Sequence, residues 1–142
     1  MKHVKIKINY RDLEGNISVE SVWASKEGDY YRIKNIPFFA PNLAYDDLID
    51  VEEDEGELYF EDIIEESGNS TIQLIIFDEN NISLVTQTLD SFKCGWEGSY
   101  LKSYFSVNVP KEVDYKLIRE YLQYGREQKI FDYQEACLAH KL

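Results

Sequence analysis

The sequence predicts an α+β protein, in which an N-terminal five-stranded antiparallel sheet or small barrel is followed by a β-α-β-α half with a final short helix. Two observations lead to this prediction. Apolar residues alternate with a period of two in the first 66 residues, whereas spacings of three and four appear after residue 77. The Ser- and Gly-containing stretch 67–70 separates the two patterns. We therefore expect a β-rich subdomain over residues 1–66 and an α/β subdomain over residues 67–142.

Short strands bounded by turn residues are expected throughout the first subdomain. Val4, Ile6 and Ile8 alternate with polar neighbours, which is typical of a strand with one buried face. Two prolines, Pro37 and Pro41, end regular pairing after the third strand. The expected strands cover residues 4–10, 17–23, 30–34, 48–51 and 58–64.

Strands and helices alternate in the second subdomain. The apolar run 71–77 predicts a strand covered on both faces, and the alternation at 105–109 predicts another. Residues 82–92 carry one apolar stripe at helical spacing, with Asn80 or Asn81 as the cap. This order of elements resembles part of a ferredoxin-like domain, so we expect residues 67–142 to be ferredoxin-like.

Two more helices are expected near the C-terminus. Asp114 is an N-cap candidate for the first, which should stop near Gly125 because glycine favours helix ends. Asp132 and Glu135 have the spacing of a capping box and predict a final short helix. The residues expected on one face of that helix are Tyr133, Ala136, Cys137 and His140.

The net charge of −12 is concentrated in one segment. Residues 42–66 contain twelve acidic residues and no Lys or Arg, so the rest of the chain is balanced. Such a segment repels phosphate backbones and attracts basic surfaces. We therefore expect a basic protein partner and no direct binding of nucleic acid.

The composition also predicts the compartment. The two cysteines, Cys94 and Cys137, are too few for a disulfide framework, and the first residues do not resemble a signal peptide. No window approaches the roughly 18 consecutive apolar residues of a membrane span. We expect a soluble cytoplasmic protein without a membrane partner.

The metal-site patterns fail on register or ligand number. If Gly56 took the sixth position of a calcium loop, its first ligand would be Val51, which has no side-chain oxygen. Cys137 and His140 form only one short-spaced pair, whereas zinc sites usually need four ligands. A buried cysteine and a frayed terminal histidine are the preferred interpretation, so no metal or cofactor is expected.

Catalytic constellations are equally sparse. The two histidines, His3 and His140, lie within three residues of the ends of the sequence, where mobility is common. Neither a Gly-x-Ser-x-Gly elbow nor a phosphate-binding glycine loop is present. Paired carboxylates facing each other across a cleft remain open, because 27 acidic residues are available. We expect no enzymatic activity and no catalytic residues.

Three surfaces are candidates for partner binding. The first is the acidic hairpin, in which the turn 53–56 joins the expected strands 48–51 and 58–64. The second is the aromatic pair Phe38 and Phe39 between Pro37 and Pro41, which could instead plug the barrel. The third is an aromatic group after the predicted first helix, with core packing as its alternative. The candidate contact residues are Glu52, Glu53, Asp54, Glu55, Phe38, Phe39, Trp96 and Tyr100.

Five strings in order carry a family resemblance: Asn35–Ala40, Ser67–Thr71, Glu97–Ser99, Val107–Pro110 and Asp132–Leu138. They resemble a bacterial family of small acidic proteins whose domain has no known function. The resemblance spans nearly the whole chain and implies no catalytic residues. Small acidic bacterial proteins of this type resemble immunity proteins, which bind and silence a toxin domain.

The leading hypothesis is therefore a non-enzymatic protein-binding protein, such as an immunity or inhibitor protein that neutralises a basic toxin domain. The alternative is a small-molecule-sensing regulatory module with a pocket near Ser67–Ser70 and Gly95–Ser99. A hydrolase with two coupled carboxylates is a third hypothesis. The oligomeric state and the docking of the two halves stay open at this point.

Overall fold

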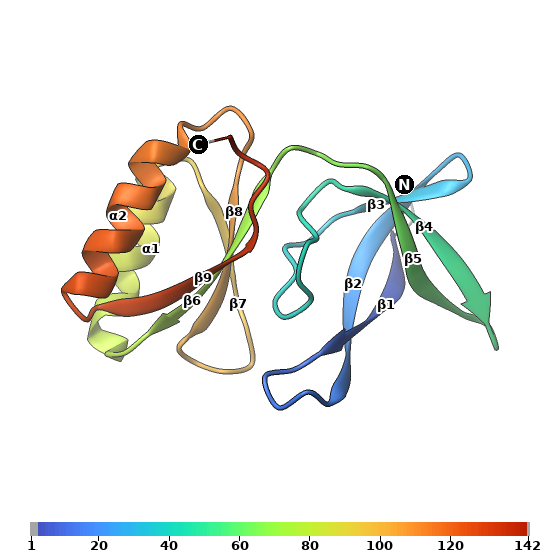
Figure 1. The fold of residues 1–142 in the computed structure, drawn as a ribbon, viewed down its shortest axis with the longest axis horizontal. Helices are drawn as coiled ribbons and strands as arrows, with labels where there is room; N and C mark the ends of the chain where they lie inside the picture. Colours follow the sequence, from blue (N-terminus) through green and yellow to red (C-terminus); the bar gives the residue numbers. More distant parts are fainter. Residues whose placement is uncertain (1–2, 142) are drawn as a thin grey trace.

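In a computed structural model, which describes residues 3–141, two β-sheets lie side by side and two helices cover the outer face of one of them (Figure 1). The α+β class is confirmed. The elements are β1 (His3–Arg11), β2 (Ile17–Glu27), β3 (Tyr30–Ile33), β4 (Leu48–Asp54), β5 (Glu57–Glu65), β6 (Ser70–Ile76), the 3-10 turn η1 (Glu79–Asn81), α1 (Ile82–Ser91), β7 (Gly95–Gly98), β8 (Tyr104–Val109), α2 (Tyr115–Glu127) and β9 (Phe131–Cys137). No helix within residues 3–141 has the length and apolarity needed to cross a membrane.

The first five strands form a closed barrel in sequence order. Neighbouring strands are antiparallel, and β1 and β5 close the barrel as a parallel pair at Ile6 and Leu58. This closure follows from the odd number of strands, since the first and fifth strands of a meander run in the same direction. The inward residues predicted from the period of two, such as Ile6, Ile8 and Val22, are buried in the barrel core.

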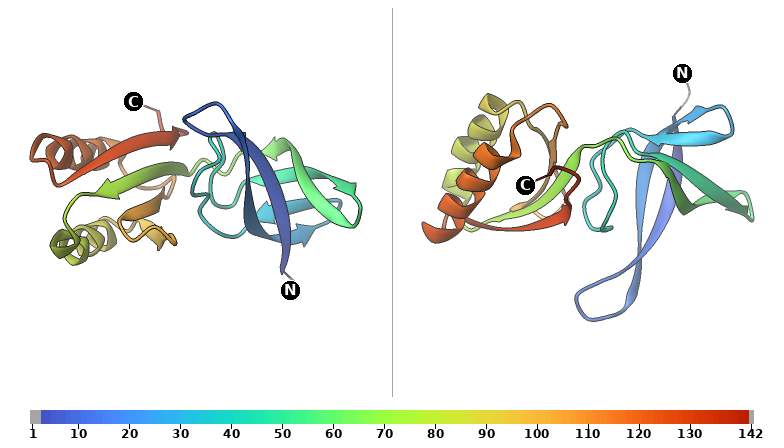
Figure 2. Two further views of the ribbon diagram at one scale, coloured as in Figure 1. Left: turned by 90° about the horizontal axis from the view of Figure 1, so that it is seen from below. Right: turned by 45° about the horizontal axis from the view of Figure 1, so that its top comes forward.

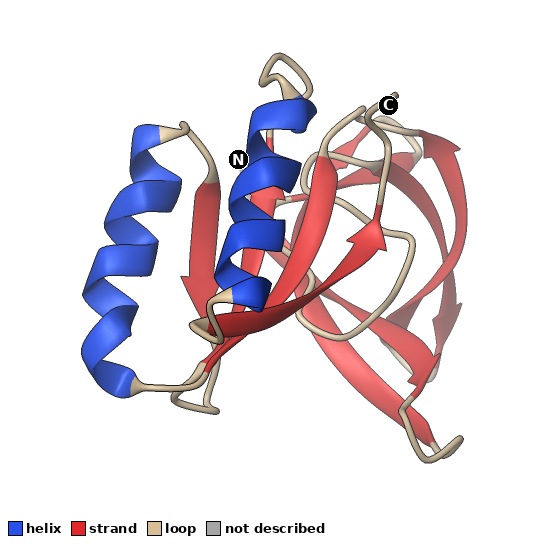
Figure 3. Cartoon of the chain, turned by 60° about the vertical axis from the view of Figure 1, so that its left-hand side comes forward, coloured by secondary structure: helices blue, strands red, loops and turns tan. Residues whose placement is uncertain are grey.

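The second sheet has the strand order β7-β8-β6-β9, with every neighbouring pair antiparallel. The chain order β6-α1-β7-β8-α2-β9 is the split β-α-β arrangement of ferredoxin-like folds. Both helices lie on one face of this sheet (Figure 3). Ile72, Leu74 and Ile76 of the central strand β6 belong to the core beneath the helices, which explains the apolar run in the sequence.

The predicted final helix is wrong, because residues 131–137 form the edge strand β9. Phe131 is buried and Tyr133 packs on the same core, so these residues follow a period of two. The Asp132 carboxylate accepts hydrogen bonds from Arg126 and from the N–H of Tyr133, not from a helix start. The strand β7 was also not predicted, because its four residues include two glycines.

Gly125 does not stop α2, which continues to Glu127. A side chain at this position would clash with the ring of Phe131, which lies directly against the helix there. The glycine therefore serves the packing of β9 on α2. The chain turns instead at Lys129, which has a positive φ of 58°.

The connection between β3 and β4 packs between the barrel and the second sheet, as two further views show (Figure 2). The Thr71 hydroxyl donates to the carbonyl of Leu43, and the N–H of Asn42 donates to the carbonyl of Ala136. Asp47 accepts hydrogen bonds from the N–H groups of Ala44 and Ser67. The barrel and the second sheet are thus tied by direct hydrogen bonds.

Candidate functional site

The acidic hairpin is the free end of the barrel, where β4 and β5 project away from the second sheet (Figure 1). Its turn is made by Glu55 and Gly56, which have positive φ values of 51° and 83°, as two-residue hairpin turns of type I′ require. Glu52, Glu53, Asp54 and Glu55 are all exposed. None of these four carboxylates has an ion-pair partner within residues 3–141. The hairpin therefore presents uncompensated negative charge to solvent.

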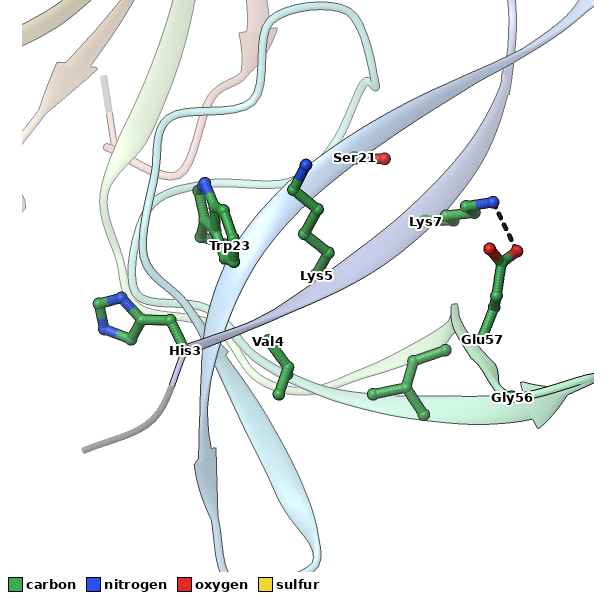
Figure 4. A pocket seen from close by; sticks show the side chains of 9 residues that line it. His3, Val4, Lys5, Lys7, Ser21, Trp23, Gly56 and Glu57 are labelled. Atoms are coloured by element: carbon green, nitrogen blue, oxygen red, sulfur yellow. Dashed lines mark hydrogen bonds and ion pairs between the residues drawn. The ribbon is translucent and has the colours of Figure 1, made fainter.

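A groove of about 430 Å³ lies beside this hairpin, between it and the outer faces of β1 and β2 (Figure 4). Gly56, Glu57 and Leu58 form the hairpin wall of the groove. The opposite wall combines cationic, polar and aromatic side chains, namely Lys5, Lys7, Ser21 and Trp23. We call this feature the hairpin groove. It brings residues 3–7, 21–23 and 56–58 together on one surface.

The register of the barrel strands produces this wall. Lys5 lies opposite Trp23 and Lys7 lies opposite Ser21 in the antiparallel β1–β2 pair, so the four side chains share the outer face. The Lys5 ammonium lies 5.1 Å from the centroid of the Trp23 ring, within the range of a cation–π contact. Trp23 nevertheless remains 47% exposed. The wall therefore offers an accessible aromatic surface next to a cation.

One ion pair bridges the two walls of the groove. The Lys7 ammonium contacts the Glu57 carboxylate at 2.5 Å, as the dashed line in Figure 4 marks. This hydrogen bond raises the pKa of Lys7 and lowers the pKa of Glu57. Both groups are solvent-accessible, so the pair adds little stability but neutralises the carboxylate that directly follows the hairpin turn. The negative charge that remains is concentrated at the hairpin tip.

The structure places Phe38 and Phe39 away from the hairpin, in the β3–β4 connection, which lies between the barrel and the second sheet. The Phe39 ring stacks between the rings of Tyr10 and Tyr104, with centroid distances of 6.0 and 5.1 Å. Phe38 accepts a hydrogen bond at its carbonyl from the Tyr104 hydroxyl. Both phenylalanines are half-buried, so they hold the two halves together at this point.

Glu20 holds this connection in place, a role that the sequence analysis did not assign to it. Its carboxylate accepts hydrogen bonds from the N–H groups of Phe38, Phe39 and Ala40 at 2.5, 3.0 and 2.9 Å. The only sign of this role in the sequence is an acidic residue at position 20, which the alternation of β2 places on the inward face, where Glu20 is buried. The carboxylate thus binds three consecutive backbone donors.

A second carboxylate, from the other sheet, holds the start of the same segment. Glu97 of β7 accepts a hydrogen bond from the N–H of Ile36 at 2.6 Å. Burial raises the pKa of Glu97, while the bond from Ile36 opposes this shift and the charge of Glu20 adds to it. Burial also raises the pKa of the Tyr104 hydroxyl well above its usual range. These groups act as structural ties between the halves.

Trp96 and Tyr100 lie on the second sheet and do not meet the hairpin groove. The Trp96 indole N–H donates to the Asp90 carboxylate at 2.9 Å, and its ring packs edge-on against Phe105. Tyr100 lies in the β7–β8 connection and is largely exposed. The predicted contact residues are therefore distributed over three places. Trp23, which sequence reasoning assigned only to a strand, is the exposed aromatic residue that lies beside the hairpin.

The structure brings one Ser and one His together near the C-terminus. The Ser70 Oγ lies 2.6 Å from His140 Nδ1, and His140 Nε2 donates to the carbonyl of Pro110, which leaves the serine hydroxyl as the donor to Nδ1. Ser70 Oγ also accepts bonds from the N–H groups of Ala139 and His140, and the residue is fully buried. The expectation of a frayed His140 is thus wrong, since the pair anchors Ala139 and His140.

The thiols are placed for packing. Burial raises the pKa of Cys94 and of Cys137 to about 11, so both are thiols at neutral pH and weak nucleophiles. Cys94 is buried beneath the helices, and Cys137 lies at the end of β9. Within residues 3–141 no three His, Cys, Asp or Glu side chains are grouped to hold a metal ion.

Comparisons with known proteins agree with the family resemblance of the sequence. The model of a domain of unknown function, DUF4265, matches residues 20–133. The crystal structure of a hypothetical protein from Neisseria gonorrhoeae is similar over 99% of each chain, with 30% identity and a TM-score of 0.88. No functionally curated protein matches.

Proposed function

The chain belongs to the DUF4265 family, whose function is unknown. From the features of its surface, we propose that it is a non-enzymatic protein-binding protein. The observation that supports this most directly is the pairing of an uncompensated acidic hairpin with the adjacent hairpin groove. The hairpin attracts a basic partner, and the groove supplies an apolar contact. The partner would be a protein with a basic face, such as a toxin domain that binds nucleic acid.

The acidic hairpin would govern the encounter with such a partner. Glu52, Glu53, Asp54 and Glu55 project at the end of the barrel, where no cation within the described chain pairs with them. Charges of one sign on a protruding element raise the association rate with an oppositely charged surface, and salt screens this effect. A row of carboxylates also resembles a phosphate backbone in charge, which suits the inhibition of a nuclease.

Trp23 would supply the apolar contact that slows dissociation. Exposed tryptophans surrounded by polar side chains are frequent hot spots of interfaces. The Trp23 indole lies in the wall of the hairpin groove, with Lys5 on its ring and Ser21 beside it. A partner that covers both the hairpin and this wall would bury the indole and keep the charges at the rim.

The sensing alternative has less support from the cavities. Asn69 and Asp47 line a second cavity of about 160 Å³, which is smaller than the roughly 300–1,000 Å³ of typical ligand pockets. The predicted second wall of this pocket, Gly95–Ser99, begins with β7, at the opposite edge of the sheet from β9. Thr71 and Gly95 both pair with Asn108 of β8, so one strand separates Ser67–Ser70 from Gly95–Ser99, and no residue of Gly95–Ser99 lines this cavity.

The test is affinity capture from the native cell lysate at 50 and 300 mM NaCl, with identification of the retained proteins. The test variant carries Glu52→Lys, Glu53→Lys and Glu55→Lys. Its matched control carries Glu14→Lys, Asp29→Lys and Glu112→Lys, three exposed acids elsewhere with the same change in net charge. We expect a basic protein that the native chain and the control retain at 50 mM NaCl and that the hairpin variant loses.

Two results would contradict the proposal. Equal retention of the partner by the hairpin variant and the control would show that net charge alone governs capture. The absence of any protein retained by the native chain at either salt concentration would leave the hairpin as a solubilising surface. Purified partner and native chain, mixed at known concentrations, then give the affinity and its dependence on salt.

A further inference from the structure

The outer face of the β1–β2 ribbon carries two parallel rows of different character. Cross-strand pairs place a basic or polar residue of β1 beside a residue of β2 at four successive positions on this face. The pairs are Lys5 with Trp23, Lys7 with Ser21, Asn9 with Val19 and Arg11 with Ile17. We call this surface the ribbon face. It has a basic row on β1 and a mainly apolar row on β2.

The apolar row of the ribbon face is exposed along its length. Ile17 is 68% exposed, Val19 53% and Trp23 47%, although β-branched and aromatic residues usually pack against something in a sheet. Contiguous exposed apolar residues rimmed by polar side chains typically mark an interaction site. The barrel interior does not need these residues, because the opposite face of β2 already supplies Val22 and Ala24 to the core.

The outer face of α2 carries the complementary pattern. Leu117 and Tyr124 are 51% and 54% exposed and lie seven residues apart, which is about two helical turns. Glu120 and Glu127 are also exposed and lie next to them on the helix surface. The inward residues of α2, Ile118 and Leu122 among them, pack on the other side of the helix. We call this surface the helix stripe.

We propose that the helix stripe of one copy of this chain docks on the ribbon face of a second copy. The apolar residues of the helix stripe are about 10.5 Å apart along the axis, and Val19 and Trp23 are about 13 Å apart along β2. Both leucine and tyrosine can therefore contact the apolar row together. In that position Glu120 and Glu127, which are also about 10.5 Å apart, lie against Lys5 and Asn9, the cross-strand neighbours of Trp23 and Val19, and Arg11 is the next residue along this face of β1. Lys5 and Arg11 have no ion-pair partner within residues 3–141.

Because each copy has a large negative net charge, this association should strengthen as salt screens the repulsion between the copies. Two copies with a charge of −12 each repel one another at long range. At 0.15 M salt the Debye length is about 8 Å, so this repulsion is largely screened, whereas close contacts in the interface persist. The association is therefore expected to strengthen when salt is raised from 10 to 150 mM. The inference uses no residue of the acidic hairpin, but Lys5 and Trp23 belong to both the ribbon face and the hairpin groove, so a second copy and the proposed basic partner would compete for them.

Sedimentation equilibrium of the full chain between 10 and 500 μM tests the proposal. At 150 mM NaCl the native chain is expected to increase in average mass with concentration. A ribbon variant, Lys5→Glu with Arg11→Glu, and a stripe variant, Glu120→Lys with Glu127→Lys, are each expected to remain monomeric. An equimolar mixture of these two variants is expected to associate. The acidic ribbon face of the first variant can meet the basic helix stripe of the second, and the native acidic stripe of the first can meet the native basic row of the second.

The matched control is Lys93→Glu with Lys111→Glu, which changes the net charge as the ribbon variant does but alters exposed residues outside both surfaces. It should associate like the native chain. A native chain that stays monomeric to 500 μM at 150 mM NaCl overturns the proposal and leaves the ribbon face for a different partner. A mixture that stays monomeric while the native chain associates also overturns it, because the interface then lies elsewhere.

Discussion

The acidic hairpin and the proline-bounded segment Asn35–Pro41 were both candidates for partner binding, and the structure treats them in opposite ways. The hairpin carboxylates project into solvent, and no ion pair within residues 3–141 involves Glu52, Glu53, Asp54 or Glu55. The segment, by contrast, is held by Glu20 from the barrel and by Glu97 and Tyr104 from the second sheet. The hairpin carboxylates are thus available to a partner, whereas the polar groups around the segment are hydrogen-bonded within the protein.

This difference separates residues that serve the fold from residues available for function. Buried polar groups with several partners stabilise only when all partners are present, and their loss is costly. Exposed charges without partners contribute little to folding, so another reason for their concentration is required. Substitutions in the segment should therefore affect stability, and substitutions in the hairpin should affect binding alone.

The largest expected effect is that of Glu20→Ala. The substitution leaves the N–H groups of Phe38, Phe39 and Ala40 without their acceptor in a largely buried position. Each unsatisfied buried donor costs about 1–3 kcal/mol, so we expect a loss on the order of 3 kcal/mol or more in the free energy of unfolding. Urea titration followed by tryptophan fluorescence measures this loss.

Glu20→Gln and Glu14→Ala sharpen that measurement. The amide of Gln keeps one acceptor oxygen but turns an NH₂ group toward backbone donors, so an intermediate loss is expected. Glu14 lies in the exposed turn between β1 and β2, and its removal should change the unfolding free energy by less than about 0.5 kcal/mol. A Glu20→Ala variant as stable as Glu14→Ala would show that the segment does not tie the halves together.

A smaller effect, with a pH signature, is expected for Glu97→Gln. Burial raises the pKa of Glu97 above its value in the unfolded chain, so the folded protein binds this proton more tightly. The contribution to stability is therefore fully present below the unfolded pKa and is lost as pH rises through the folded pKa. Gln cannot ionise and keeps an acceptor for the N–H of Ile36.

The stability of Glu97→Gln relative to the native chain should therefore increase between pH 4 and pH 7. Burial also raises the pKa of Asp47, but Asp47 titrates in both proteins and cancels from the difference. Urea midpoints at half-unit pH intervals give the comparison. A difference that is independent of pH would place the Glu97 carboxylate in a solvated environment and would remove it from the ties between the halves.

The parts of the fold that could be predicted are those in which local pattern and tertiary packing agree. The alternation of Ile6 and Ile8, and the apolar run of β6, report directly on a buried face. The final helix was mispredicted because the capping-box spacing of Asp132 and Glu135 is a local signal. Packing of Phe131 against Gly125 and pairing with β6 override that signal.

Of the candidate site, the acidic hairpin was predicted from the sequence, and the aromatic wall of the groove beside it was not. A run of acidic residues has to lie on the surface, so the hairpin could be identified from the sequence. Which aromatic residue lies beside it depends on the closure of the barrel, which brings Lys5 and Trp23 next to Glu57 through the β1–β5 pairing. That pairing joins residues about fifty positions apart, and no local pattern encodes it.

The smallest expected effect is that of neutralising the hairpin, and it completes the comparison. Glu52→Gln, Glu53→Gln and Glu55→Gln remove like charges from a solvent-exposed turn without removing an ion pair. The unfolding free energy should therefore change by no more than about 0.5 kcal/mol, and the relief of repulsion favours a gain. Urea unfolding at 10 and 300 mM NaCl measures both the change and its screening, since any gain should diminish at the higher salt concentration. A loss of several kcal/mol would instead assign the hairpin acids to the fold, and the contrast with the Glu20 segment would no longer hold.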